Sequence, residues 1–222
     1  MRLKIFESGL ESSLRSFIRR IDKKLSEIVD AKTGRVDSLI VLGDGNEDAR
    51  VILLLCHHLD GKKAVGVIKP VLKRYGAIQE LKRLNIIMNC SKIVFVFDQE
   101  DDDLDELYRD VENELNGIGI KFEKGEKFSI SRIRSYSCSL GGHVFELVVV
   151  VNGLDEVGGP NHKIEDHLVK LAGVASKGDS KEVWNKLDED ERFGVYRKIL
   201  NDRKDAEGVF AQHFAGLGLL DC

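Results

Sequence analysis

Acidic side chains follow two of the most apolar stretches of this sequence, and their grouping points to metal-ion chemistry. The turn Gly43-Asp44-Gly45-Asn46-Glu47-Asp48 comes after the apolar run 39–42, and Asp98-Gln99-Glu100-Asp101 follows the apolar run 93–97. Carboxylates held close together repel one another unless some bind protons or a cation neutralises them. Mg²⁺ and Mn²⁺ favour oxygen ligands, and Mg²⁺ commonly binds one or two carboxylates together with substrate phosphate and water. The two groups therefore predict a divalent-metal site for a phosphate-bearing substrate.

A simpler interpretation applies to part of the second group. Asp and Glu side chains stabilise the first turn of a helix because its N-terminus carries partial positive charge, and a helical pattern follows the acids of 101–106. Asp98 differs because it sits directly on the end of the apolar run. We therefore expect Asp98 and Glu100 to serve the site, whereas the acids from Asp102 to Glu106 begin the next helix.

Alternating apolar runs and helical patterns define the elements that must position these acids. The expected strands cover 39–42, 64–68 and 93–97, and the helical patterns that follow them lie in 47–59, 77–87 and 104–120. Strands without polar alternation, each followed by a helix, indicate a parallel sheet covered on both faces. In such a sheet the ligand crevice lies beyond the carboxyl ends of the strands, which is where both acidic groups fall.

Different patterns flank this core. Residues 10–28 place apolar side chains at spacings of three and four, which predicts an N-terminal amphipathic helix. Residues 127–137 alternate as a half-exposed strand does, and Gly141-Gly142 is expected to turn that strand into the buried run 143–153. The remainder is mostly helical in pattern. The expected units are an N-terminal helix in 1–35, an α/β core in 36–158 and a helical C-terminal extension in 159–222.

The composition bounds the class of protein. A content of 42% hydrophobic and 32% charged residues is typical of a globular chain, and the net charge of −4 argues against nucleic-acid binding through bulk positive charge. Basic clusters in 15–24 and 69–83 still permit a nucleic-acid partner. No apolar run approaches the roughly 18 residues that span a bilayer, and the first residues lack a signal-peptide pattern. Because four scattered cysteines form no CxxC pair, we expect a cytoplasmic protein without membrane contact.

The order of the strands, and the acids on them, resemble a TOPRIM domain, the module shared by topoisomerases, bacterial primases and nucleases of the overcoming-lysogenization-defect type. That family has a Glu-Gly turn after its first strand and an Asp-x-Asp pair after its third. Here Asp44-Gly45-Asn46-Glu47-Asp48 resembles the first motif and Asp98-Gln99-Glu100 the second, over roughly residues 36 to 175. The family's Glu position directly after Val41 holds Leu42, so the nearest acid lies two residues later.

The resemblance implies a TOPRIM-like, Rossmann-like fold and Mg²⁺- or Mn²⁺-dependent breaking or making of phosphodiester bonds in nucleic acid. It also suggests roles for individual residues. The expected catalytic residues are Asp44 and Glu47, the metal ligands are Asp98, Glu100 and Asp101, and the substrate-binding residues are Gly43, Gly45 and Lys69. Glu165 and Asp166 in the stretch HKIEDHLVKL resemble acids that border the site in small TOPRIM-like proteins, although an acidic pair there also simply starts a helix.

Two other functions remain open from the sequence. Leu42 at the family's Glu position leaves room for an inactive TOPRIM-like module that binds metal, nucleotide or protein, and the C-terminal helices could dock a partner or a second copy. The turn VLGDGNEDA also resembles the first motif of S-adenosylmethionine-dependent methyltransferases, whose glycines let the backbone approach the cofactor. That family needs an acid after its second strand, where this chain has Lys69 and Pro70.

Overall fold

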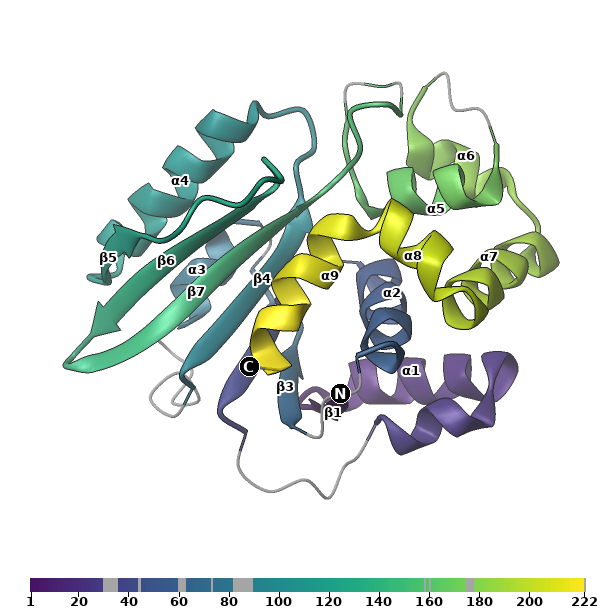
Figure 1. Cartoon of the computed structure of the whole chain (residues 1–222), viewed down its shortest axis with the longest axis horizontal. Helices are drawn as coiled ribbons and strands as arrows, with labels where there is room; N and C mark the ends of the chain where they lie inside the picture. The colour runs from purple at the N-terminus through teal and green to yellow at the C-terminus, as the bar shows by residue number, and fades with distance from the viewer. Residues whose placement is uncertain are drawn as a thin grey trace.

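The computed structural model describes residues 1–29, 36–43, 45–59, 63–72, 74–81, 90–157, 159, 161–174 and 178–221. Within these residues seven strands form one sheet in the order β1-β3-β2-β4-β7-β6-β5 (Figure 1). The strands are β1 (Arg2–Ile5), β2 (Ser38–Leu42), β3 (Ala64–Ile68), β4 (Lys92–Asp98), β5 (Lys121–Lys124), β6 (Ile133–Leu140) and β7 (His143–Asn152).

Helices cover both faces of this sheet, as expected. The α-helices are α1 (Ser8–Ile21), α2 (Asn46–His57), α3 (Gly76–Leu81), α4 (Leu104–Gly117), α5 (Ile164–Ala172), α6 (Ser180–Lys186), α7 (Glu189–Asn201), α8 (Arg203–Val209) and α9 (Ala211–Gly218). Short 3₁₀ helices cover Lys23–Glu27 and Leu219–Asp221. Residues 82–87, the last part of the expected helix 77–87, lie outside the described residues.

The central strands are parallel and buried on both faces. β2 pairs with β3 and with β4, and β4 pairs with β7, all in parallel. Alternate side chains point to opposite faces, so Ile40 and Leu42 join one hydrophobic layer whereas Leu39 and Val41 join the other. This confirms the expected α/β class with a mostly parallel sheet, because strands buried on both sides need continuous apolar runs.

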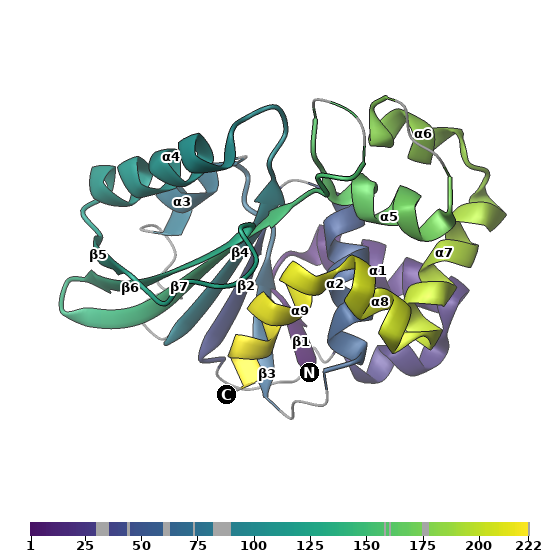
Figure 2. The ribbon, with the colours of Figure 1, turned by 45° about the horizontal axis from the view of Figure 1, so that its top comes forward.

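The two hydrophobic layers differ in size. Helices α3 and α4 cover one face of the sheet, and the remaining α-helices pack on the other face (Figure 2). Aromatic residues of the C-terminal helices belong to the larger layer, where Trp184, Tyr196 and Phe210 are at most 1% exposed. These rings are therefore core residues and do not form an exposed docking stripe.

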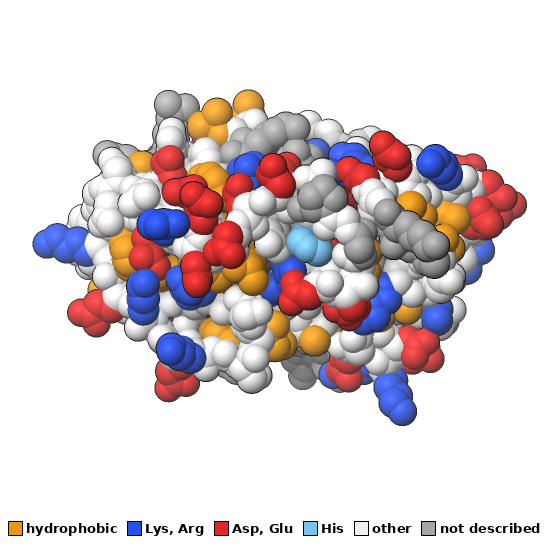
Figure 3. Space-filling view, turned by 90° about the horizontal axis from the view of Figure 1, so that it is seen from above, with side chains coloured by type: hydrophobic (Ala, Val, Ile, Leu, Met, Phe, Trp, Pro, Cys, Tyr) orange, Lys and Arg blue, Asp and Glu red, His pale blue; other side chains and the backbone are white. Residues whose placement is uncertain are grey.

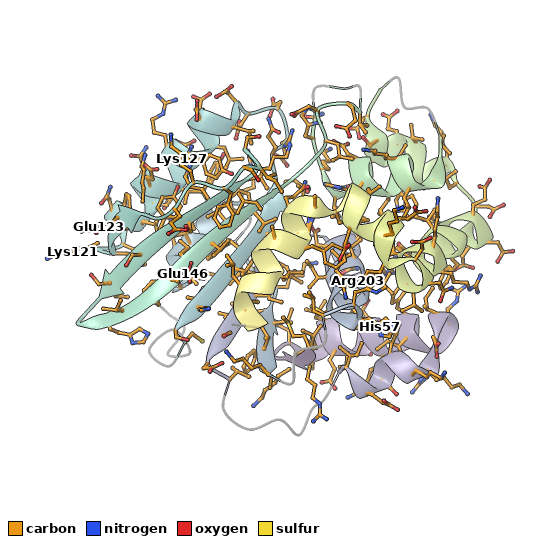
Figure 4. The ribbon with its side chains drawn as sticks, viewed as in Figure 1. His57, Lys121, Glu123, Lys127, Glu146 and Arg203 are labelled. Atoms are coloured by element: carbon orange, nitrogen blue, oxygen red, sulfur yellow. The ribbon has the colours of Figure 1, made fainter. Side chains whose placement is uncertain are left out.

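The antiparallel part of the sheet begins later than the pattern predicted. β6 and β7 form a hairpin through Gly141 and Gly142, whose φ values of 57° and 88° suit glycine. The alternating segment starts as a strand only at Ile133, and β5, which pairs with β6, was not predicted. Lys121 and Glu123 on β5 point outward from the edge of the sheet (Figure 4), so this short strand lacks an apolar signal.

The N-terminal segment also departs from the prediction of one helix over 10–28. α1 ends at Ile21, and Asp22 adopts an extended conformation with φ of −157°. The Asp22 side chain then accepts a hydrogen bond from the amide of Lys24 at 2.8 Å, which caps a separate 3₁₀ helix. Among the described residues, no helix has the length and apolar character needed to cross a membrane.

Candidate functional site

The carboxyl ends of β2, β4 and β7 meet at one edge of the sheet. Leu42 pairs with Val96, and Asp98 pairs with Asn152, so these three strands end close together. Helix α2 starts just beyond β2 at Asn46. Figure 3 looks at the molecule from the side of these strand ends and shows acidic side chains interspersed with basic ones. The strands β2 and β4, which carry the two acidic groups, are therefore neighbours in the sheet.

A single amide group links two carboxylates at this edge. Asn152 is fully buried, and its Nδ2 donates hydrogen bonds to Asp48 Oδ1 and to Asp98 Oδ1, each at 2.8 Å. The two acceptor oxygens therefore lie no farther apart than twice that distance. Asp48 is only 2% exposed, and its Oδ2 accepts from the amide of Gly45 at 3.1 Å. Asp98 Oδ1 also accepts from the amide of Ile164 at 3.0 Å, which ties β4 to the start of α5.

Helix α9 fixes the direction in which this amide points. His213 Nε2 lies 2.7 Å from Asn152 Oδ1, and burial lowers the pKa of His213 well below its usual value. The neutral ring must donate its Nε2 proton because Oδ1 can only accept. His213 Nδ1 is then an acceptor, and it has no hydrogen-bond partner among the described residues. The Asn152 NH₂ group is consequently held toward Asp48 and Asp98.

Glu165 adds a third carboxyl group to this neighbourhood. It lies in the first turn of α5 and is 5% exposed. Its pKa is raised to about 7, chiefly by burial and also by the negative charges of Asp98 and then Glu47. The position of Glu165 beside these acids was expected only from the family resemblance. Its raised pKa follows from its burial in this fold.

Glu47 is held by neighbours on the other side of α2. Its Oε1 lies 2.7 Å from Arg50 Nη1, and its Oε2 accepts a hydrogen bond from the hydroxyl of Tyr196 on α7. Two consecutive residues of a helix point about 100° apart, so Glu47 and Asp48 face different partners. Asp48 is the acid that shares the Asn152 amide with Asp98. Asp44 lies outside the described residues.

The acids that follow Asp98 turn away from this centre. Glu100 has a left-handed backbone with φ of 57°, and its carboxylate pairs with Arg74 at 3.1 Å. Asp102 also pairs with Arg74 and accepts a hydrogen bond from Tyr75. Asp101 is exposed in the turn that precedes α4. In this structure Glu100 is thus engaged by a cation rather than by the bridge at Asp98.

Asp166, the neighbour of Glu165, holds loops together. Its Oδ2 accepts from His162 Nδ1 at 2.9 Å and from the amide of Leu154 at 3.2 Å, and its Oδ1 accepts from the hydroxyl of Ser180. Asp166 is 1% exposed, so these bonds replace the water it loses. This arrangement gives Asp166 a structural role beside the site.

The candidate substrate-binding residues have clear structural contacts. A Cβ atom on Gly43 would lie 2.9 Å from Phe97 Cβ, so the close approach of β2 to β4 requires glycine there. Lys69 follows β3, and its Nζ lies 3.4 Å from Asn46 Oδ1 at the start of α2. Lys69 is therefore the basic side chain that reaches the beginning of the acidic turn from the neighbouring strand.

The described residues do not form a closed metal centre, so an ion at this edge of the sheet would have to bind few side chains. Among the described residues, no three or more His, Cys, Asp or Glu side chains converge closely enough to hold a metal ion by themselves. Mg²⁺ commonly takes only one or two protein carboxylates and completes its shell with water and substrate phosphate. Asp48 and Asp98 would supply that number, and Glu165, whose pKa is raised first by burial and then by the charge of Asp98, lies beside them.

Comparison with known proteins does not place this chain in a family. No family model matches the sequence, and no curated protein or solved structure gives a significant match. The site must therefore be interpreted from its own residues.

Sequence reasoning missed the residues that organise the site. Asp48 lies inside the acidic turn, but a helical pattern does not tell which of two adjacent acids faces the sheet. Asn152 ends the apolar run of β7, and this polar residue at a buried strand end is the signal that could have marked it. His213 lies 61 residues beyond Asn152, and nothing in the local pattern connects the two.

Proposed function

We propose that this protein catalyses Mg²⁺- or Mn²⁺-dependent breaking or joining of nucleic-acid phosphodiester bonds, as a nuclease or phosphotransferase of the TOPRIM type. The observation that carries the proposal is the Asn152 bridge between Asp48 and Asp98, with the buried Glu165 beside it. These groups lie beyond the carboxyl ends of neighbouring parallel strands, the usual position of ligand sites in α/β sheets.

The residues divide the chemistry among them. Asp48 and Asp98 would hold the divalent cation, which supplies positive charge to stabilise the phosphate when bound. Glu165 has a pKa of about 7 and can accept or release a proton near neutral pH, as general acid–base catalysis requires. Asn152 keeps the two aspartates in fixed positions, and Lys69 at the mouth of the turn can contact substrate phosphate.

A cleavage assay with metal titration tests this proposal. Wild-type protein should nick supercoiled plasmid or cleave single-stranded RNA with Mg²⁺ or Mn²⁺ and be inactive in EDTA. Asp98→Asn should abolish cleavage because it removes a ligand charge. The matched control is Asp105→Asn, whose side chain is 91% exposed and which should cleave as wild type does.

A second measurement keeps the metal separate from the reaction. Mg²⁺ should raise the melting temperature of the wild type at pH 8 and should leave that of Asp98→Asn unchanged. A wild-type protein that neither cleaves nucleic acid nor responds to Mg²⁺ or Mn²⁺ would contradict the proposal.

A second function, a non-catalytic TOPRIM-like binding module, is favoured by one observation. Glu47 is engaged by Arg50 and Tyr196, and Asp48 is almost completely buried. In such a module these carboxylates stabilise the fold, and a bound Mg²⁺ or Mn²⁺ ion would add stability without catalysis. Metal-dependent stabilisation in the absence of any cleavage of DNA or RNA would select this function over the enzyme.

A further inference from the structure

A cleft separate from the carboxylate bridge opens between α1 and α7. These helices lie against each other at one end of the molecule (Figure 1), and the cleft has a volume of about 610 Å³. Three arginines from three helices line it: Arg20 on α1, Arg50 on α2 and Arg192 on α7. Asp48, Asp98 and Glu165 do not line it.

The lining of the cleft carries an excess of positive charge. Three arginines and one acid, Glu189, line the cleft, and with Glu47, which pairs with Arg50, the group carries a net charge of +1. Arg20 forms an ion pair with Glu189, and Arg50 pairs with Glu47 at 2.7 Å. Arg192 makes no ion pair with a described residue. In a chain with net charge −4, this is a local site for an anion.

Aromatic rings hold two of these guanidinium groups. Arg20 Cζ lies 4.2 Å from the centre of the Phe193 ring, and Arg50 Cζ lies 5.5 Å from the centre of the Phe17 ring. Stacking fixes the plane of a guanidinium and leaves its N–H edge available for hydrogen bonds. Arg50 Nε is buried and has no hydrogen-bond partner among the described residues, so one donor of this group is unsatisfied.

Hydroxyl groups complete the polar lining. Ser12, Ser13 and Ser16 of α1 line the cleft beside the arginines. Each can donate a hydrogen bond to an anionic oxygen. The planar fork of arginine matches phosphate oxygens in pairs, and a phosphoryl group near neutral pH brings up to two negative charges. That charge is opposite in sign to the net charge of the cleft.

We propose that the cleft between α1 and α7 binds the phosphoryl group of a phosphorylated ligand through Arg20, Arg50 and Arg192. This inference goes beyond the proposed phosphodiester chemistry and does not depend on it, because neither Asp48 nor Asp98 lines the cleft. Arg50 also contacts Glu47, so an anion in the cleft would compete for the cation that now neutralises that carboxylate.

Calorimetric titration with inorganic pyrophosphate, in EDTA and at low salt, tests the proposal. Wild type should bind it saturably, and Arg192→Gln should weaken binding by about tenfold or more, the loss expected for one charge-assisted pair. Arg20→Gln should weaken it in the same direction. The control is Arg197→Gln, an exposed arginine on the same helix that does not line the cleft and should bind as wild type does.

The outcomes separate this cleft from the carboxylate site. Asp98→Asn should retain pyrophosphate binding even though it loses its response to Mg²⁺. Competition by adenosine monophosphate or by a short single-stranded oligonucleotide then tells whether a free nucleotide or a nucleic-acid strand supplies the phosphate. No saturable binding to the wild type, or equal binding by wild type and Arg192→Gln, would overturn the proposal.

Discussion

At the residue scale, Asn152 decides whether the buried carboxylate of Asp48 and the half-buried carboxylate of Asp98 are tolerated side by side. Its amide donates to both, and His213 leaves it no other orientation. Asn152→Asp would place a third carboxyl group among them, and we expect this to lower the free energy of unfolding by about 3 kcal/mol or more at pH 8. The loss should be smaller at pH 5, where one of the acids can be protonated. Urea unfolding at both pH values measures it, with the exposed Asn185→Asp as the control. An equal, small effect of the two substitutions would contradict the bridging role.

Glu165 gives the molecule a pH dependence of predictable sign. Its folded pKa of about 7 exceeds the usual carboxyl value of 4.5 because burial disfavours the charged form, and Asp98 adds to that effect. The folded state therefore binds a proton that the unfolded state releases, and stability is lost as pH rises from about 4.5 through about 7. Glu165→Gln should remove this loss, worth roughly 3 kcal/mol by linkage. Its urea midpoint should exceed that of the wild type more at pH 8 than at pH 5.

The exposed Glu182→Gln on α6 is the control for this pH experiment, because it should follow the wild type at every pH. Parallel pH profiles of the wild type and Glu165→Gln would show that Glu165 titrates normally. Mg²⁺ offers a further check, since a cation beside Glu165 should favour the ionised form and flatten the wild-type profile at pH 8.

Sequence reasoning at this scale located the strand ends but not the contacts between them. Asp98 was identified because an acid directly on an apolar strand end is unusual. Asp44 and Glu47 were the acids expected near Asp98; the structure shows that Asp48 on α2 shares Asn152 with Asp98, and Asp44 lies outside the described residues. That choice depends on the rotation of α2 relative to β2, which packing against the sheet determines and a single sequence does not display.

At the element scale, the acidic run after Asp98 illustrates a helix start. Asp103 is the N-cap of α4, and its Oδ1 accepts from the amides of Asp105 at 2.9 Å and Glu106 at 3.4 Å. Asp103→Ala should lower the free energy of unfolding by about 1 kcal/mol, the usual contribution of such a cap. Thermal or urea unfolding measures this, and Asp101→Ala in the preceding turn should have little effect. If Asp101→Ala were the more damaging change, the helix start would be misplaced.

The packing of α9 on the sheet depends on one glycine. A Cβ atom on Gly216 would lie 2.3 Å from Val150 Cγ2, closer than van der Waals contact allows. We expect Gly216→Ala to destabilise the fold by about 1 to 3 kcal/mol through overpacking. Gly194→Ala on α7 meets nothing within 4 Å and should instead be neutral or stabilise, because alanine favours helix. Unfolding of both variants in urea compares them directly, and a tolerated Gly216→Ala would mean that α9 can shift.

Elements were predictable where their apolar patterns were strong. The runs at 39–42, 64–68 and 93–97 are strands within a residue or so of their expected bounds. The edge strands β1 and β5 were missed because each has only four residues, at least two of them charged. Their strand conformation depends on pairing with β3 and β6, a long-range condition that local patterns do not reveal.

At the scale of the whole molecule, the C-terminal helices are part of the central core. Phe210 and Leu217 are fully buried in the same hydrophobic layer as Val148 and Val150 of β7. A chain ending at Asp202 would expose this layer and leave Asn152 without His213. We expect such a truncation to lose cooperative unfolding, as followed by circular dichroism. A sharp transition with retained Mg²⁺ response would show that residues 1–202 fold without α8 and α9. Arg203, at the start of α8, donates a hydrogen bond to the carbonyl of His58 at 3.1 Å. Figure 4 labels Arg203 and His57, the residue before His58.

The link from His213 to Asn152 has a consequence for the order of events during synthesis. Asp48, Asp98 and Asn152 emerge from the ribosome long before residue 213, yet the amide that separates the two aspartates receives its orienting proton only from α9. Domains tend to fold as units during translation, so the site at the sheet edge is complete only after α9 has been synthesised. A nascent chain that stalls before residue 213 would therefore hold Asp48 and Asp98 close together without the His213 hydrogen bond that orients Asn152. The site would be complete only in a chain that includes α9.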